Sequence, residues 1–155
     1  MRLRLIVVGG RPPGWARAAV ADYLRRLPVA LKLEMVRLPL ARGHERNPAR
    51  AVVAEGQRML ARLAPRDAVI SLDGCGDAWS TGDLARRLRA WQSAGTDVAL
   101  LVGGPDGLAS ACRERADARW SLSALTLPHA LVQVIVVEQI YRAVSLNAGH
   151  PYHRG

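Results

Sequence analysis

The last six positions of the chain gather side chains that can take part in chemistry. His150, Tyr152, His153 and Arg154 stand there within five residues of one another. Histidine accepts or donates a proton near neutral pH, arginine holds phosphate or stabilises an anion, and tyrosine can stack on a base. Because chain ends are usually frayed and featureless, this concentration predicts that the tail takes part in function.

Three further segments are candidates for binding a ligand through backbone groups. They are Leu72–Gly76, Gly103–Gly107 and Ser121–Pro128, and each follows a predicted strand. In parallel sheets, ligands bind beyond the carboxyl ends of the strands, and glycine lets a ligand approach the backbone closely. Small and aliphatic side chains around backbone N–H and C=O groups suit an adenine. For Gly103–Gly107 a plain tight turn before a helix remains the alternative.

Several other kinds of site are excluded by their absent motifs. The sequence has no GxxxxGK[ST], HExxH, CxxC or GxSxG. His150 and His153 have no carboxylate or thiol near them in sequence, so we predict no metal site. His129, directly after Pro128, is interpreted as a residue of a helix start rather than a ligand. Two cysteines cannot build a disulfide framework, which indicates reduced thiols and a cytoplasmic protein.

The elements that must position these residues alternate regularly between strand and helix. Apolar runs and turn residues predict strands at 3–8, 31–38, 68–72, 97–102 and 120–123. Helical spacing and start signals predict helices at 15–27, 47–63, 80–93, 108–116 and 128–147. This alternation is typical of an α/β fold, with a mostly parallel sheet flanked by helices, in one domain over residues 1–155.

The net positive charge of the chain lies in residues 1–70. The 22 Lys and Arg residues against 13 Asp and Glu give a net charge of +9, and residues 1–70 carry all of this excess. A field of one sign in one half favours a polyanionic partner such as nucleic acid. Half of the residues are apolar, which excludes a disordered chain, and no apolar run is long enough to span a membrane. We also see no signal peptide.

The last predicted helix has apolar surface on two sides. Between residues 131 and 144 the polar residues are Gln133, Glu138, Gln139 and Arg142, and at 100° per residue Gln133 lies roughly opposite the other three. We therefore expect one side to meet the sheet and the other to meet a second copy of the chain. The alternative is a helix buried centrally within one monomer.

The C-terminal motifs closely resemble the ribosomal large subunit methyltransferase H family. The matching segments are WSLSALTLPH at 120–129, EQIYRA at 138–143 and HPYHR at 150–154. LVGGPDGL at 101–108 and Leu72-Asp73 match as well, and the likeness runs from Met1 to Arg154. Gly74-Cys75-Gly76 is more glycine-rich than is usual in the family.

This resemblance implies a SPOUT α/β knot, with the C-terminal segment threaded as a trefoil, acting as a homodimer. It also implies S-adenosylmethionine bound in a bent form, no metal, and N3-methylation of a pseudouridine in helix 69 of 23S rRNA on the assembled 70S ribosome. By position, the residues implied to line the cofactor pocket are Leu72, Gly103, Leu122, Ser123, Ala124, Leu125, Thr126 and Leu127.

The implied reaction needs the imide proton of N3 to be removed, because the protonated nitrogen is a poor nucleophile. Our hypothesis assigns His153 to this proton, Arg154 to the anion or a phosphate, and Tyr152 to positioning, with Arg142 as a second candidate cation. Two alternatives stay open. One is a knotted methyltransferase for another RNA position, such as a ribose oxygen, and the other is a ribosome-binding factor without catalysis.

Overall fold

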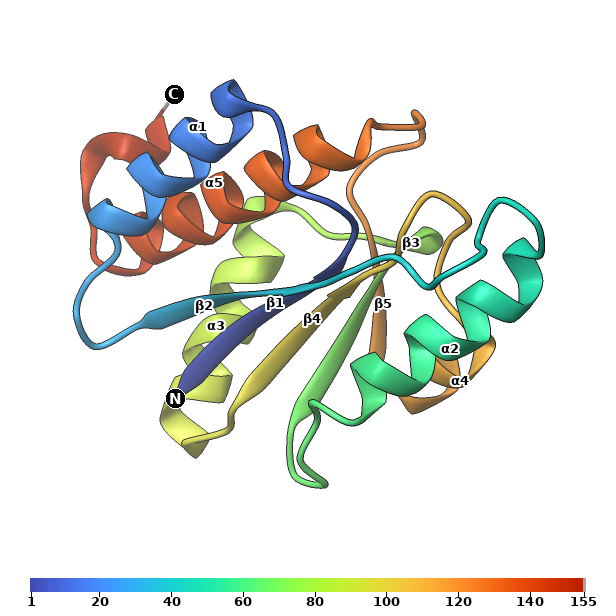
Figure 1. Ribbon diagram of the computed structural model, residues 1–155. Coiled ribbons are helices and arrows are strands. Elements are labelled where there is room, and N and C mark those ends of the chain that lie inside the picture. The colour runs from blue at the N-terminus through green and yellow to red at the C-terminus, as the bar shows by residue number, and fades with distance from the viewer. Residues whose placement is uncertain (155) are drawn as a thin grey trace.

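A single five-stranded parallel sheet forms the centre of the computed structural model, which describes residues 1–154 (Figure 1). Its strands are β1 (Arg2–Val8), β2 (Lys32–Leu38), β3 (Ala68–Ala78), β4 (Val98–Val102) and β5 (Ala118–Ser121). They lie in the order β2-β1-β4-β3-β5, and every adjacent pair is parallel. This confirms the predicted α/β class. The trefoil knot implied by the resemblance stays a prediction.

The helices form one layer on each face of the sheet. They are α1 (Gly14–Arg26), α2 (Pro48–Leu60), α3 (Thr81–Ala94), α4 (Ser110–Arg115) and α5 (His129–Asn147), and a short 3-10 helix, η1 (Pro151–Arg154), ends the described chain. Helices α1, α5 and α3 cover one face and α2 and α4 the other (Figure 1). None of the helices in residues 1–154 is long and apolar enough to cross a membrane.

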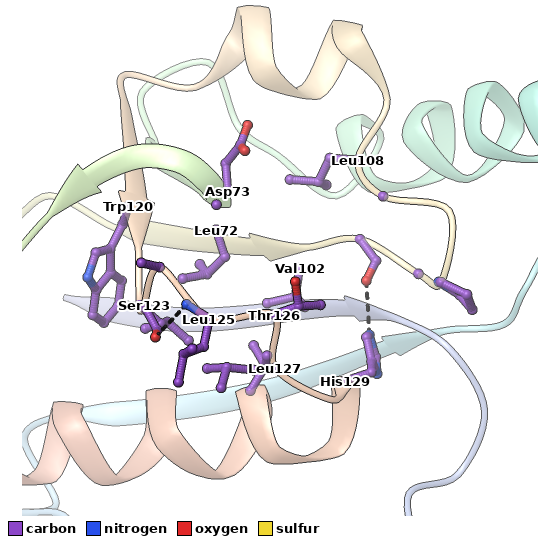
Figure 2. A pocket seen from close by; sticks show the side chains of 18 of the residues that line it. Leu72, Asp73, Val102, Leu108, Trp120, Ser123, Leu125, Thr126, Leu127 and His129 are labelled. Atoms are coloured by element: carbon purple, nitrogen blue, oxygen red, sulfur yellow. Dashed lines mark hydrogen bonds between the residues drawn. The ribbon is translucent and has the colours of Figure 1, made fainter.

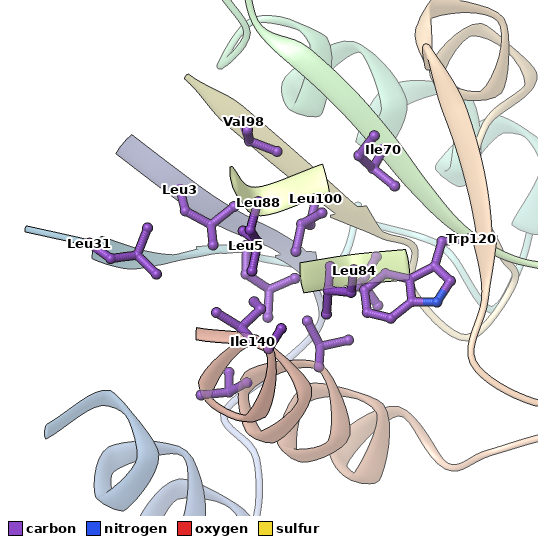
Figure 3. Close-up of a cluster of buried hydrophobic side chains, with 14 of the residues drawn as sticks. Leu3, Leu5, Leu31, Ile70, Leu84, Leu88, Val98, Leu100, Trp120 and Ile140 are labelled. Atoms are coloured by element: carbon purple, nitrogen blue, oxygen red, sulfur yellow. The ribbon is translucent and has the colours of Figure 1, made fainter. Parts of the chain in front are cut away.

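Each layer encloses its own apolar core. Figure 3 shows the first, in which Leu5 and Leu100 of the sheet meet Leu84 of α3 and Ile140 of α5. The second lies under α2 and α4 and includes Ile6, Leu101, Met59 and Cys112. All five residues of β4 are buried, since the strand has neighbours on both sides and helices on both faces. The uninterrupted apolar run of this strand follows from that position.

The predicted start signals of two helices are confirmed. Asn47 accepts a hydrogen bond from the backbone N–H of Arg50 at 3.1 Å, with Pro48 as the first helical residue of α2. Ser80 and Asp83 form a reciprocal capping box at the start of α3. These bonds satisfy N–H groups that would otherwise lack partners in the first turn.

The third strand is longer than the sequence predicted. We expected it to end at Leu72 and Asp73–Gly76 to form a loop, but β3 continues to Ala78 with a shift of register against β5 between Leu72 and Asp77. Gly76 makes this path possible, because a Cβ there would lie 2.7 Å from the backbone carbon of Arg119. The glycine-rich segment therefore allows β3 and β5 to approach each other closely, and Gly74 in it also lines a pocket.

Helix α5 lies between α1 and α3, so part of its second apolar side is covered within the chain (Figure 1). Val136 and Ile140 are fully buried toward the sheet, and Gln133 is buried as well. Leu131 and Ile135 in the first two turns stay partly exposed. Two features thus explain the apolar surface on both sides of α5. The helix lies centrally in its layer, and part of its apolar surface remains exposed to solvent.

Candidate active site

A cavity of about 590 Å³ lies beyond the carboxyl ends of β4 and β5 and beside Leu72–Gly74 of β3 (Figure 2). Its volume is in the range of pockets that bind cofactors. The structure brings together here all eight residues that the resemblance implied for the cofactor: Leu72, Gly103, Leu122, Ser123, Ala124, Leu125, Thr126 and Leu127. Binding of a cofactor by these residues stays a prediction, but their convergence shows that one pocket can use all of them.

One wall of the pocket is a tight backbone loop between Gly103 and Leu108. The N–H of Gly107 donates to the carbonyl of Gly104 at 3.0 Å, and Gly107 has a φ of +88°. A Cβ on Gly103 would lie 2.5 Å from the carbonyl carbon of Gly107. The tight turn and the pocket wall, which the sequence presented as alternatives, are therefore the same structure.

The opposite wall is the loop between β5 and α5. Leu122 and Leu127 line the pocket with aliphatic side chains. The backbone N–H of Leu125 donates to Ser123 Oγ at 3.0 Å (Figure 2). The Leu125 side chain is 75% exposed. Together the walls offer aliphatic surface and backbone polar groups, the combination that suits a purine.

His129 belongs to this pocket, which the sequence analysis missed by interpreting it only as a helix-start residue. Its Nε2–H donates to the carbonyl of Gly103 at 2.9 Å (Figure 2). Gln133 donates to His129 Nδ1 at 3.2 Å, and Arg37 donates to Gln133 Oε1 at 2.6 Å. With Nδ1 accepting and Nε2 donating, the ring is neutral. The i, i+4 spacing of His129 and Gln133 was the available signal.

The surroundings of His129 favour this neutral state. Burial lowers the pKa of His129 from its ordinary value of 6.5, and the positive charge of Arg37 acts in the same direction, against the Gly103 carbonyl. Gln133 is only 1% exposed, so water cannot reach the hydrogen bond that its amide donates to His129. The ring is therefore built to hold the Gly103 loop in place.

A second polar pair in the pocket joins residues forty positions apart. Asp73 Oδ2 accepts from Arg113 Nε at 2.9 Å, and Oδ1 accepts from the backbone N–H of Cys75 at 3.0 Å. The Cys75 N–H and then Arg113 lower the pKa of Asp73, so the carboxylate is ionised at neutral pH. Only the fold brings Arg113 to Asp73, so no sequence pattern could reveal the pair.

The C-terminal tail is fixed to the surface of α5 and α1. Tyr152 Oη lies 3.2 Å from both Tyr23 Oη and Glu138 Oε1, and its ring meets the Tyr141 ring edge-on at 4.6 Å. Arg142 bonds Glu138 at 2.8 Å and lies over the Tyr152 ring. Burial, and then Tyr23 and Glu138, raise the pKa of Tyr152. We call these four residues, Tyr23, Glu138, Arg142 and Tyr152, the tail anchor.

Beyond the tail anchor the two remaining candidates are differently placed. His153 Nδ1 donates to the carbonyl of His150, which leaves Nε2 of a neutral ring as a hydrogen-bond acceptor. Arg154 is exposed. The anchor therefore fixes the end of the chain while His153 keeps one nitrogen able to accept a proton.

The tail and the pocket lie apart within one chain. His129 at the start of α5 lines the pocket, whereas Tyr152 contacts Glu138 and Arg142, about 13 and 20 Å further along the helix axis at 1.5 Å per residue. Neither Arg142 nor any residue of Tyr152–Arg154 lines the cavity. Among residues 1–154, no three His, Cys, Asp or Glu side chains are grouped so as to hold a metal ion.

Comparisons with known proteins agree with this geometry. Residues 1–153 match the family model described as predicted SPOUT methyltransferase. Proteins named ribosomal RNA large subunit methyltransferase H from Alkalilimnicola ehrlichii, Thioalkalivibrio sulfidiphilus and Hahella chejuensis are 54%, 52% and 46% identical to this chain, each covering 99% of both sequences.

Solved structures share the fold at low identity. A probable methyltransferase from Bordetella pertussis has a TM-score of 0.56 and 16% identity, covering 93% of this chain and 96% of that one. A probable methylase family protein from Haemophilus influenzae has a TM-score of 0.56 and 10% identity, covering 97% of this chain and 69% of that one. At these identities the likeness concerns the arrangement of the elements alone.

Proposed function

This chain belongs to the SPOUT methyltransferase family, and we propose that it methylates N3 of a pseudouridine in helix 69 of 23S rRNA, with S-adenosylmethionine as donor. We further propose that it acts in the cytoplasm, on the assembled ribosome. The single observation that carries the proposal is the pocket of backbone and aliphatic groups formed by residues of β3 and by the loops after β4 and β5. Relatives named as rRNA large subunit methyltransferases, alike over their full lengths, support the choice of rRNA.

The residues present fit the donor. Gly103 lets its loop close on itself, since a Cβ there would lie 2.5 Å from the carbonyl carbon of Gly107, and the closed loop forms one wall of the pocket. Leu122 and Leu127 supply aliphatic surface, and the Leu125 side chain is exposed for further contact. S-adenosylmethionine supplies an electrophilic methyl group on a sulfonium. The protein's part is to hold the two reactants in line, which by itself accounts for much of the acceleration in such transfers.

The acceptor nitrogen requires a base and a cation, and the tail offers both. His153 Nε2 accepts the N3 proton while Nδ1 remains bonded to the carbonyl of His150. Arg154 balances the charge of the imidate anion or a neighbouring phosphate. Tyr152 and Arg142, held in the tail anchor, position these two residues rather than touch the substrate.

Because the tail lies away from the pocket of its own chain, these residues serve the pocket of a second copy. We therefore propose a homodimer in which each protomer's tail completes its partner's site. The partly exposed Leu131 and Ile135, near the pocket end of α5, are the apolar surface available for this contact. Dimers of this kind are twofold symmetric, so both sites form at once.

The proposed reaction is tested by transfer of a labelled methyl group to ribosomes from a strain that lacks the gene. We expect incorporation into 70S ribosomes and little or none into free large subunits or naked rRNA, with mass spectrometry placing the label at N3 of a pseudouridine in helix 69. Label at a ribose oxygen or at another nucleotide would replace this target with a different one. No incorporation, together with no binding of S-adenosylmethionine, would favour a non-catalytic ribosome factor.

The shared site predicts complementation between two inactive variants. Gly103→Ala impairs donor binding and His153→Ala removes the base, so at a donor concentration well below saturation each homodimer should be nearly inactive. After the two are unfolded and refolded together in equal amounts, half of the dimers are mixed and each mixed dimer has one intact site. We expect about a quarter of the wild-type rate in this mixture. If the mixture stays as inactive as its components, the tail does not act across the dimer.

A further inference from the structure

The loops that follow β1 and β2 adjoin the pocket, although they do not line it. Since all five strands are parallel, every loop that follows a strand begins at the same edge of the sheet, the one formed by the carboxyl ends of the strands (Figure 1). A Cβ on Gly104 of the pocket wall would lie 3.3 Å from Leu40 Cδ2, and one on Gly9 would lie 3.1 Å from His129 Cε1. The surface formed by residues 9–13 and 39–50 is therefore continuous with the pocket.

Four exposed arginines lie on this surface, and we call Arg11, Arg42, Arg46 and Arg50 the carboxyl-end arginines. In the part of the chain that the structure describes, no carboxylate lies within 4.0 Å of any of them. Two acidic residues lie nearby: Glu45 is exposed in the same loop, and Glu55 is buried. The surface therefore keeps a positive excess.

At the opposite edge of the sheet, where the strands begin, several arginines are paired with carboxylates. Arg2 pairs there with Asp97 at 3.0 Å and Arg4 pairs with Asp67, which is buried. Arg115 lies 3.5 Å from Asp117 on the same side. The positive charge of the first seventy residues is thus partly neutralised at the amino ends of the strands. Beside the pocket, no carboxylate of residues 1–154 pairs with the exposed arginines. Composition alone could not show this separation.

The loop that carries two of the carboxyl-end arginines is held in a defined shape. Glu55 Oε1 accepts the backbone N–H of Ala41 at 3.0 Å, and the N–H of Arg46 donates to the carbonyl of Gly43 at 3.0 Å. Arg42 and Arg50 line a hollow of about 360 Å³. A guanidinium binds a phosphate through two parallel N–H donors, and a fixed loop lowers the entropy lost on binding.

We propose that the carboxyl-end arginines bind the phosphate backbone of the RNA whose base enters the pocket. This inference rests on the proposed function, because it takes rRNA as the substrate. A base that enters the pocket brings its own strand to the carboxyl ends of the β-strands, and the loops that carry the exposed arginines adjoin the pocket there. Phosphate contacts of this kind set the position of the nucleic acid without reading its sequence.

The experiment compares two double variants that remove equal charge. Arg42→Ala/Arg46→Ala changes the proposed surface. Arg62→Ala/Arg66→Ala removes two exposed arginines at the amino ends, which likewise have no carboxylate of residues 1–154 within 4.0 Å. Binding to purified 70S ribosomes is measured over a series of salt concentrations, and binding of S-adenosylmethionine is measured separately. Both variants should keep the wild-type affinity for the donor.

We expect the first pair to weaken ribosome binding by about tenfold or more and to lower the salt dependence. The slope of log K against log salt should fall by about 0.7–0.9 for each phosphate that the variant no longer neutralises. The second pair should change binding less than about twofold. Equal losses for both pairs, or no loss for the first, would overturn the proposal. The comparison needs only binding, so a wild-type protein that binds ribosomes without methylating them would refute the proposed function and leave this test intact.

Discussion

Gly103→Ala should weaken binding of the methyl donor while leaving a folded protein. A Cβ at this position would lie 2.5 Å from the carbonyl carbon of Gly107 and 2.7 Å from the backbone nitrogen of Leu108. Because both neighbours are backbone atoms, the loop itself must move to relieve the contacts. Overpacking of this kind typically costs about 1–3 kcal/mol, and at about 1.4 kcal/mol per factor of ten we expect the affinity for the donor to fall by about 5- to 140-fold.

Isothermal titration with S-adenosylmethionine measures the affinity, and circular dichroism checks that the variant is folded. Gly74→Ala is the matched control, since Gly74 also lines the pocket but a Cβ there meets nothing within 4 Å. We expect Gly74→Ala to bind like the wild type. Unchanged affinity in Gly103→Ala, or an equal loss in both variants, would show that the Gly103 loop does not contact the donor.

His129→Ala should have the largest effect on stability among the pocket variants. It leaves the carbonyl of Gly103 and the amide nitrogen of Gln133 without their partner, and Gln133 is buried. Each buried polar group left unsatisfied costs about 1–3 kcal/mol. The loop that His129 holds should also become mobile, so KM for the donor should rise more than kcat falls.

Urea unfolding measures the loss of stability, and steady-state kinetics measure the rise in KM. His44→Ala is the control, because His44 lies outside the pocket, and we expect it to change the free energy of unfolding by less than about 0.5 kcal/mol. A positioning role would be refuted if His129→Ala lowered kcat alone and left KM and stability unchanged.

The same histidine predicts a dependence of stability on pH. Its pKa is lower in the folded protein than the ordinary 6.5, so between these two values the unfolded chain binds more protons than the folded one. This contribution to stability is therefore complete above about pH 6.5 and decreases as the pH falls toward the folded pKa. His129→Gln should lack this decrease, which unfolding curves between about pH 5 and 8 can measure.

Sequence patterns were sufficient for the elements and for the composition of the pocket walls. Alternating strands and helices predicted the parallel α/β sheet, because hydrophobic period and capping residues are local properties. Glycines and leucines after the strands, with the family resemblance, predicted eight cofactor residues, and the structure brings all eight to one pocket, although cofactor binding by them stays a prediction. Asp73–Gly76 was placed wrongly in a loop, since pairing with β5 extends β3 and depends on a strand about forty residues away.

Tertiary structure alone decided which polar groups meet and which charges face solvent. His129 with Gly103, Asp73 with Arg113, and Tyr152 with Tyr23 are pairs separated by 26, 40 and 129 positions, and no local pattern relates them. The sequence determined that the basic excess lies in residues 1–70, whereas the sheet determined that Arg4 meets Asp67 and that Arg42 meets no carboxylate of the described chain. The physical reason is that periodicity reports how each residue faces its own element, while hydrogen bonds and ion pairs depend on distances that only the packed chain fixes.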